Sequence, residues 1–105
     1  ALPILLSYCD LMITSGGMNS IAECIEKEVP MLVCPLSLKS DQLGNSARVV
    51  YHGLGLRARI KLDSSRTIEK RIVQLFENYA TFKRNLSMMR TKILAESTAI
   101  NTEVI

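Results

Sequence analysis

The chain has 105 residues, the size of one small domain, and 48% of them are hydrophobic, which is too many for a disordered segment. Thirteen lysine and arginine residues against ten acidic ones leave a net charge of +3 without a continuous basic run, so we expect no nucleic-acid partner. The apolar start is too short for a membrane span and lacks the basic residues of a signal peptide, so we expect a cytoplasmic location and no transmembrane segment.

The cysteines argue against a disulfide framework or a metal centre. Cys9, Cys24 and Cys34 are odd in number and include no C-x-x-C pair. The chain has a single histidine, His52, which we interpret as the end of a helix before Gly53. We therefore expect reduced cysteines, two of them in the core, and no bound metal.

Strand and helix patterns alternate in the first 60 residues. Short apolar runs at residues 10–14, 31–34 and 53–60 have the length and boundaries of strands. A helix is predicted over residues 19–27, with Ile21, Ala22, Cys24 and Ile25 on one face, and a second over residues 41–51. In the second helix Ser40 is the expected N-cap, and Leu43, Ala47 and Val50 form the apolar stripe. This order predicts right-handed crossovers and a parallel sheet, which is the α/β class.

The last third of the chain is helical. Apolar residues recur at helical spacing over residues 65–79 and again over 82–97, which predicts two amphipathic helices that close the domain. Ser64 or Ser65 can cap the first of them. Residues 98–105 lack this rhythm, and we expect a tail there. No linker or repeat divides residues 1–105, so the sequence predicts one domain.

A glycine pair follows the first predicted strand. In an open parallel sheet, ligands bind beyond the carboxyl ends of the strands, which is where Ser15, Gly16 and Gly17 would lie. The helix that follows starts with N–H groups that have no intrahelical partner, and its dipole favours an anion. Asn19 and Ser20 can cap that helix or donate hydrogen bonds to a phosphate group.

Three further polar residues extend the pattern. Glu23 lies one turn deeper on the face of Asn19 and Ser20, where a carboxylate can accept hydrogen bonds from both hydroxyls of a ribose. Asp41 and Gln42 follow the second strand and offer the acceptor and donor groups that sugar hydroxyls require. The same residues also fit a tight turn, helix caps and a solvated carboxylate, and the residues alone leave both interpretations open.

Together, the stretches "ITSGGMNSIAEC" and "VPMLVCPLSLKSDQLGNSARV" resemble a known family. They are similar to the carboxyl-terminal, nucleotide-sugar-binding domain of the GT-B UDP-glycosyltransferases, a superfamily that includes UDP-glucosyl, glucuronosyl and macrolide glycosyltransferases. The resemblance runs from about Leu2 to Asn78 and implies a Rossmann-like three-layer domain, the carboxyl-terminal half of a GT-B fold. Matching positions are Gly16, Gly17, Asn19, Ser20, Glu23, Val29, Pro30, Met31, Pro35, Asp41, Gln42 and Asn45.

The resemblance implies a role for each matching polar position. Diphosphate binding falls on Ser15, Gly16, Gly17, Asn19 and Ser20, ribose binding on Glu23, and binding of the donor sugar on Asp41 and Gln42. Three positions depart from the family pattern: Ser15 stands for the usual histidine, Glu28 for a glycine and Ser46 for an alanine. Replacing the histidine removes one donor to the diphosphate, which is worth about 1–3 kcal/mol.

The resemblance also implies what the chain lacks. The donor would be a UDP-sugar or TDP-sugar, bound as a substrate with no cofactor, and a hexose would pass to an acceptor hydroxyl. The general base belongs to an amino-terminal, acceptor-binding domain, in the same polypeptide or in a separate subunit. No catalytic residue is therefore expected here, and we expect the chain alone to be inactive, as a part of something longer.

A second hypothesis comes from a different class. Ser15 in place of the histidine also fits a catalytically silent interaction or regulatory module, or the partner subunit of a split glycosyltransferase. A sugar-nucleotide epimerase of the same architecture is disfavoured, because the Asn-Ser and Asp-Gln pairs fit the transferases better.

Overall fold

Three short strands form one parallel sheet in the computed structural model, which describes residues 10–37 and 41–104. The strands are β1 (Met12–Thr14), β2 (Met31–Val33) and β3 (Gly55–Arg57), in the order β1-β2-β3. β1 pairs with β2 and β2 pairs with β3, both in parallel. The predicted parallel sheet is confirmed, although each strand is shorter than its apolar run. Cys9 and Ser40 lie outside the described residues.

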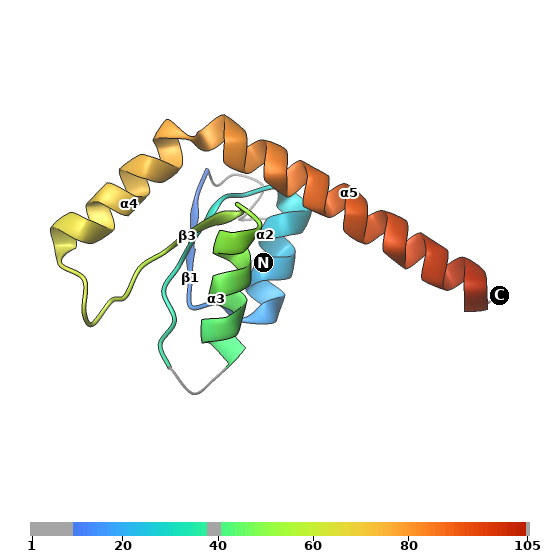
Figure 1. The fold of residues 1–105 in the computed structure, drawn as a ribbon, viewed down its shortest axis with the longest axis horizontal. Helices are drawn as coiled ribbons and strands as arrows, with labels where there is room; N and C mark the ends of the chain where they lie inside the picture. Colours follow the sequence, from blue (N-terminus) through green and yellow to red (C-terminus); the bar gives the residue numbers. More distant parts are fainter. Residues whose placement is uncertain (1–9, 38–40, 105) are drawn as a thin grey trace.

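Helices cover both faces of this sheet (Figure 1). On one side lie α2 (Met18–Lys27) and α3 (Asp41–Tyr51), which connect the strands. On the other side lies α4 (Ser65–Glu77), and the final helix, α5 (Tyr79–Val104), returns across the sheet to contact α2. The predicted three-layer, Rossmann-like α/β architecture is therefore confirmed.

The central strand β2 divides the core into two parts. Because side chains alternate along a strand, Met31 and Val33 pack against the layer of α2, α3 and α5. Leu32 and Cys34 point the other way and pack against α4. Met31, Leu32 and Val33 are fully buried, as expected for a strand covered on both faces.

The buried faces of α2 and α3 differ from the prediction. In α2, Ile21 and Cys24 are buried, but Ala22 is exposed. In α3, Asn45, Ser46 and Val49 are buried, whereas the predicted stripe is half-buried at Leu43 and exposed at Ala47 and Val50. The reason lies in hydrogen bonding: Ser46 donates to the backbone oxygen of Leu43 over 2.7 Å, and Asn45 donates across to the first loop. A polar side chain that is satisfied in this way can be buried at little cost.

Helix α2 ends in an unusual backbone conformation. Glu28 has a φ of 56° and ψ of 47°, in the left-handed region that glycine adopts most easily. The resemblance noted above has a glycine at this position. The Nζ of Lys83, on α5, donates to the backbone oxygen of Glu28 over 2.6 Å and so ties the end of α2 to the last helix.

The carboxyl-terminal helices confirm one prediction and correct another. Ser64 is the N-cap of α4, and its Oγ accepts a hydrogen bond from the N–H of Thr67 over 3.2 Å. α5 continues to Val104, so the stretch beyond Ser97 is helical although its sequence lacks the apolar helical spacing. Residues 79–104 contain no glycine or proline to end the helix, and extending a helix fixes only one residue for each new hydrogen bond. α5 runs out from the body in Figure 1 and makes 52 Å the longest dimension.

Candidate functional site

Two loops meet at the carboxyl edge of the sheet. One loop leaves β1 at Thr14 and enters α2, and the other leaves β2 at Val33 and leads to α3. Both helices start at the lower end of the sheet in Figure 1. Because the strands are parallel neighbours, this edge brings the glycine pair and the start of α3 close together.

Gly16 fits into the narrowest part of this edge. Its φ of 97° is one that side-chain-bearing residues rarely adopt, and a Cβ placed there would lie 3.0 Å from Cγ1 of Val33 and 3.2 Å from the backbone oxygen of Gln42. The N–H of Gly16 donates to Oγ1 of Thr14 over 3.3 Å. Gly17 differs, because a Cβ there would meet no described atom within 4 Å. The turn is therefore closed at Gly16 and open at Gly17.

One hydrogen bond joins the first loop to α3. The side-chain nitrogen Nδ2 of Asn45 donates to the backbone oxygen of Gly16 over 3.0 Å, across 29 positions in sequence. Asn45 is only 6% exposed. In the sequence, Asn45 matches the family pattern but has no predicted role. Its role follows from the structure, where its amide is buried on the sheet-facing side of α3.

The start of α2 is capped differently from the prediction. Gly17 is the N-cap, and no side chain makes a capping hydrogen bond there. Asn19 and Ser20 therefore lie inside the first turn and do not cap the helix. The first hydrogen bond of the helix joins the N–H of Ile21 to the oxygen of Gly17, which leaves the N–H groups before Ile21 without an intrahelical acceptor.

The remaining predicted residues lie around the same edge. Asn19 and Asp41 are exposed, whereas four side chains are half-buried: Ser15, Ser20, Glu23 and Gln42. Gln42 has a structural role here, because its Oε1 accepts a hydrogen bond from the N–H of Leu36 over 3.0 Å and so holds the second loop. Asp41 is the first residue of α3, where its carboxylate interacts favourably with the positive end of the helix dipole.

Glu23 has one oxygen that protein groups leave unsatisfied. Its Oε2 is inaccessible to solvent and accepts no hydrogen bond from the described residues. A buried acceptor without a donor costs about 1–3 kcal/mol. Glu23 follows Asn19 by four positions and Ser20 by three, so it shares their side of α2. A hydroxyl donor from a ligand would relieve this cost, but it can reach the oxygen only if the side chain of Glu23 turns outward.

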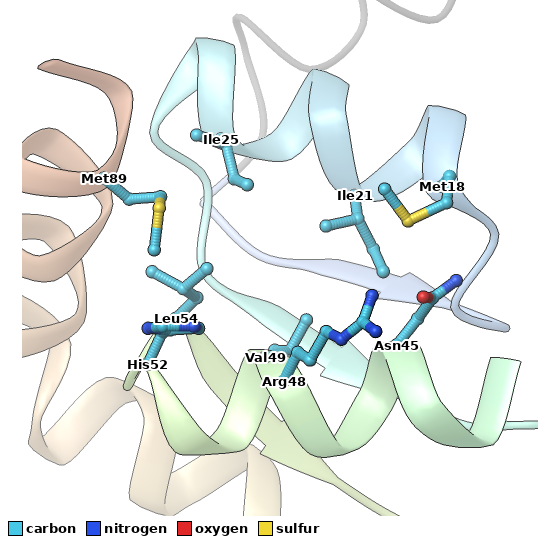
Figure 2. A pocket seen from close by; sticks show the side chains of 9 residues that line it. All are labelled: Met18, Ile21, Ile25, Asn45, Arg48, Val49, His52, Leu54 and Met89. Carbon is cyan, nitrogen blue, oxygen red and sulfur yellow. The ribbon is translucent and has the colours of Figure 1, made fainter. Parts of the chain in front are cut away.

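A separate hollow lies between the helices above the sheet (Figure 2). This groove of about 180 Å³ has a mostly apolar lining: Met18, Ile21, Ile25, Asn45, Arg48, Val49, His52, Leu54 and Met89. None of the predicted diphosphate, ribose or sugar residues contributes to it. Asn45, which joins the first loop to α3, stands at one end of this groove.

The thiol that follows β2 is not activated as a nucleophile. Cys34 follows β2 directly, and burial raises the pKa of its thiol, with a smaller contribution in the same direction from the carboxylate of Asp63. The thiol therefore stays protonated at neutral pH and is a poor nucleophile. Within residues 10–37 and 41–104, no group of three or more His, Cys, Asp or Glu side chains could hold a metal ion.

Comparison with known proteins decides the family. A model of the glycosyltransferase family 28 C-terminal domain matches residues 3–103. The chain belongs to this family. Its resemblance to the carboxyl-terminal domain of GT-B glycosyltransferases is thereby confirmed. No helix that the structure describes is long and apolar enough to cross a bilayer.

Two relatives illustrate the range of proteins to which this family 28 C-terminal domain is similar. It is 34% identical over 101 residues to the zeaxanthin glucosyltransferase of Pantoea ananas, a match that covers 95% of the chain and 22% of the relative. It is also 34% identical over 89 residues to the UDP-N-acetylglucosamine--N-acetylmuramyl-(pentapeptide) pyrophosphoryl-undecaprenol N-acetylglucosamine transferase of Clostridium botulinum, covering 82% of the chain and 25% of the relative.

Solved structures agree with this assignment. The glycotransferase of kitacinnamycin superposes with a TM-score of 0.79 and 30% identity, covering 89% of this chain and 23% of that one. Spinosyn forosaminyltransferase, at 21% identity and a TM-score of 0.76, supports the fold. The family 28 C-terminal domain thus spans about a quarter of the length of the proteins it matches.

Proposed function

We propose that this chain is the donor-binding part of a glycosyltransferase and that it holds a UDP-sugar at the carboxyl edge of its sheet. The observation that carries the proposal is the hydrogen bond from Asn45 to Gly16, because it holds the glycine turn against the start of α3. Polar groups from both loops then border one edge, as a ligand with a diphosphate and a sugar requires. Membership of a glycosyltransferase family supports a nucleotide sugar as the substrate and no cofactor.

The diphosphate would lie at the start of α2. The N–H groups of the first turn have no intrahelical acceptor, and the positive end of the helix dipole favours an anion. Gly17 leaves open space through which a phosphate can approach the backbone. The proposed diphosphate-binding residues are Ser15, Gly16, Gly17, Asn19 and Ser20.

The ribose and the donor sugar would lie on either side of the diphosphate. We assign the ribose to Glu23, whose unsatisfied oxygen can accept from a ribose hydroxyl. The donor sugar falls to Asp41 and Gln42, whose Oε1 accepts a hydrogen bond from the N–H of Leu36. The base can be uracil or thymine, because no residue proposed here contacts it.

The reaction needs a further domain. An acceptor hydroxyl, deprotonated by a base outside this chain, would attack the anomeric carbon of the sugar, and its bond to the diphosphate would break. Charge develops on the leaving diphosphate, and the start of α2 would stabilise it. We therefore propose that residues 1–105 act as one domain with an amino-terminal, acceptor-binding domain, in the same polypeptide or a partner subunit, and are inactive alone.

Ser15 is the observation that favours a second candidate function. It stands where the resemblance has a histidine, and its hydroxyl makes no hydrogen bond to any described residue. A domain that keeps the fold with a weakened diphosphate site fits a catalytically silent regulatory module or a subunit of a split enzyme. Titration of the unmodified protein with UDP separates the two, because only a donor site retains affinity for the nucleotide.

Binding calorimetry tests the donor site directly. We would titrate the 105-residue chain, and the complete polypeptide that carries it, with UDP, TDP, UDP-glucose and UDP-N-acetylglucosamine. Glu23→Gln should weaken binding by 10- to 100-fold, since a hydrogen bond to a charged group contributes about 1.5–3 kcal/mol.

Glu26→Gln is the matched control, because Glu26 is exposed on the same helix. This variant should bind like the parent. Equal affinities for both variants would contradict the assignment of Glu23. A folded complete polypeptide that binds none of the four nucleotides would contradict the donor site itself and favour the silent module.

A further inference from the structure

The apolar groove separates α2 from α3 along their length (Figure 2). Side chains of both helices line it, with Asn45 at one end and Met89 of α5 at the other. Among the described residues, no backbone hydrogen bond joins α2 directly to α3. The placement of one helix relative to the other therefore depends on the sheet beneath them and on the contacts that hold their ends.

The starts of the two helices are joined at the carboxyl edge of the sheet. Nδ2 of Asn45, on α3, donates to the backbone oxygen of Gly16, which directly precedes the N-cap of α2. This bond leaves the far ends of the helices to be held by another element.

Two side chains of α5 hold those far ends. Nζ of Lys83 donates over 2.6 Å to the backbone oxygen of Glu28, the C-cap residue of α2. Two positions later in α5, Nδ2 of Asn85 donates over 3.0 Å to the backbone oxygen of Gly53, just beyond the end of α3. Both bonds are partly buried. α5 therefore bridges the ends of α2 and α3.

The backbone at both ends lies close to α5. Glu28 and Gly53 have φ values of 56° and 66°, in the left-handed region that ends many helices. A Cβ on Gly53 would lie 2.5 Å from Nδ2 of Asn85, so α5 packs directly against the backbone there. Leu86, the next residue of α5, is buried in one cluster with Ile21 of α2 and Val49 of α3. α5 thus fixes the spacing of the two helices by packing as well as by hydrogen bonds.

We propose that Lys83 and Asn85 are positioning residues for the donor site. Rigid helices transmit a displacement from one end to the other, so the ends that α5 holds set the direction of the first turns of α2 and α3. The proposed diphosphate lies at the first turn of α2, and the proposed donor sugar lies at the first turn of α3. Because this role rests on the proposed donor site, it concerns ligands that contact both helices at once.

Nucleotide titration of the complete polypeptide separates positioning from stability. A nucleotide sugar would contact both helices, whereas UDP would contact only α2. Lys83→Met and Asn85→Ala should each weaken binding of the better-bound of UDP-glucose and UDP-N-acetylglucosamine about threefold to tenfold, and binding of UDP by less than about twofold. A variant that only lowers the folded fraction would weaken both ligands by the same factor. Lys83→Arg, which keeps a donor, should restore the ratio of the two affinities.

The matched controls are Lys92→Met and Ser87→Ala, at exposed positions of the same helix. Both controls should bind like the parent. Equal weakening of UDP and the nucleotide sugar in Lys83→Met and Asn85→Ala, or no weakening, would overturn the positioning role. A folded parent that binds no nucleotide would contradict the donor site itself.

A measurement without ligand tests the positioning role separately from the donor site. In two-dimensional amide NMR spectra, Lys83→Met should shift the signals of residues 18–20 at the start of α2, and Asn85→Ala those of residues 42–45 at the start of α3. The two control variants should leave these signals in place. Unchanged signals in folded Lys83→Met and Asn85→Ala would overturn the positioning role whatever the nucleotide titrations give.

Discussion

Gly16 and Gly17 are adjacent in sequence, but their surroundings in the structure differ. Gly16 has a φ of 97° and almost touches Val33 and Gln42, so its missing side chain allows the two loops to approach. Gly17 has a φ of −67°, which any residue adopts, and faces open space. The first glycine is therefore needed by the fold, whereas the fold does not require the second.

A pair of alanine variants separates these two roles. Gly16→Ala should lower the free energy of unfolding by about 2 kcal/mol, because the added methyl group meets Val33 and the backbone is strained. Gly17→Ala should leave that free energy unchanged or raise it by about 0.5 kcal/mol, since alanine restricts the unfolded chain.

Urea unfolding measures the free energy of unfolding of both variants, and titration with UDP measures their affinity for the nucleotide. Gly17→Ala should weaken UDP binding although its fold is intact, because the methyl group occupies the space proposed for the diphosphate. Equal stability of the two variants would show that the turn is not as tight as the contacts of Gly16 indicate.

At the scale of elements, α3 shows how a helix can bury polar residues. Asn45 and Ser46 face the sheet together with Val49, and each polar side chain donates to a backbone oxygen. The hydrophobic pattern predicted the helix correctly but selected the wrong stripe, because hydrophobicity alone does not register that a hydrogen bond offsets the burial of an amide.

Removing the amide of Asn45 should therefore destabilise the domain. Asn45→Ala leaves the backbone oxygen of Gly16 without its donor, and we expect the free energy of unfolding to fall by about 1–3 kcal/mol. Val50→Ala, on the exposed side of α3, should change it by less than about 0.5 kcal/mol. A neutral effect of Asn45→Ala in urea unfolding would mean that the packing of the first loop against α3 does not depend on this bond.

At the scale of the whole molecule, α5 belongs to the body at its start and leaves it further on. Leu86 is fully buried in the core cluster that includes Met31, whereas Met88, two positions later, is 65% exposed. Residues 90–97 are exposed as the helix runs out from the body. The first half of α5 therefore completes the core between the sheet and α2.

Two variants of α5 compare the contributions of a buried and an exposed residue to the free energy of unfolding. Leu86→Ala should lower the free energy of unfolding by about 3 kcal/mol, because it removes a fully buried side chain and leaves a cavity. Met88→Ala should change it by less than about 0.5 kcal/mol. Thermal or urea unfolding of both variants is the measurement. Similar, small effects would mean that α5 is not part of the same cooperative unit as the sheet.

The sequence by itself determined the alternation of strands and helices and the parallel sheet, and it predicted a candidate site beyond the strands. These features follow from local patterns: apolar runs of strand length, helical spacing, and turn residues such as Gly16. The motif pair also indicated the family, since its residue types and spacing occur together in one stretch.

Only the tertiary structure decided which residues join these parts. The role of Asn45, the N-cap at Gly17, the exposure of Ala22 and the extent of α5 all depend on contacts between distant segments or on the absence of a helix-ending residue. Periodicity records which residues are apolar, but burial is decided by what lies opposite each side chain and by whether a hydrogen bond offsets the loss of water.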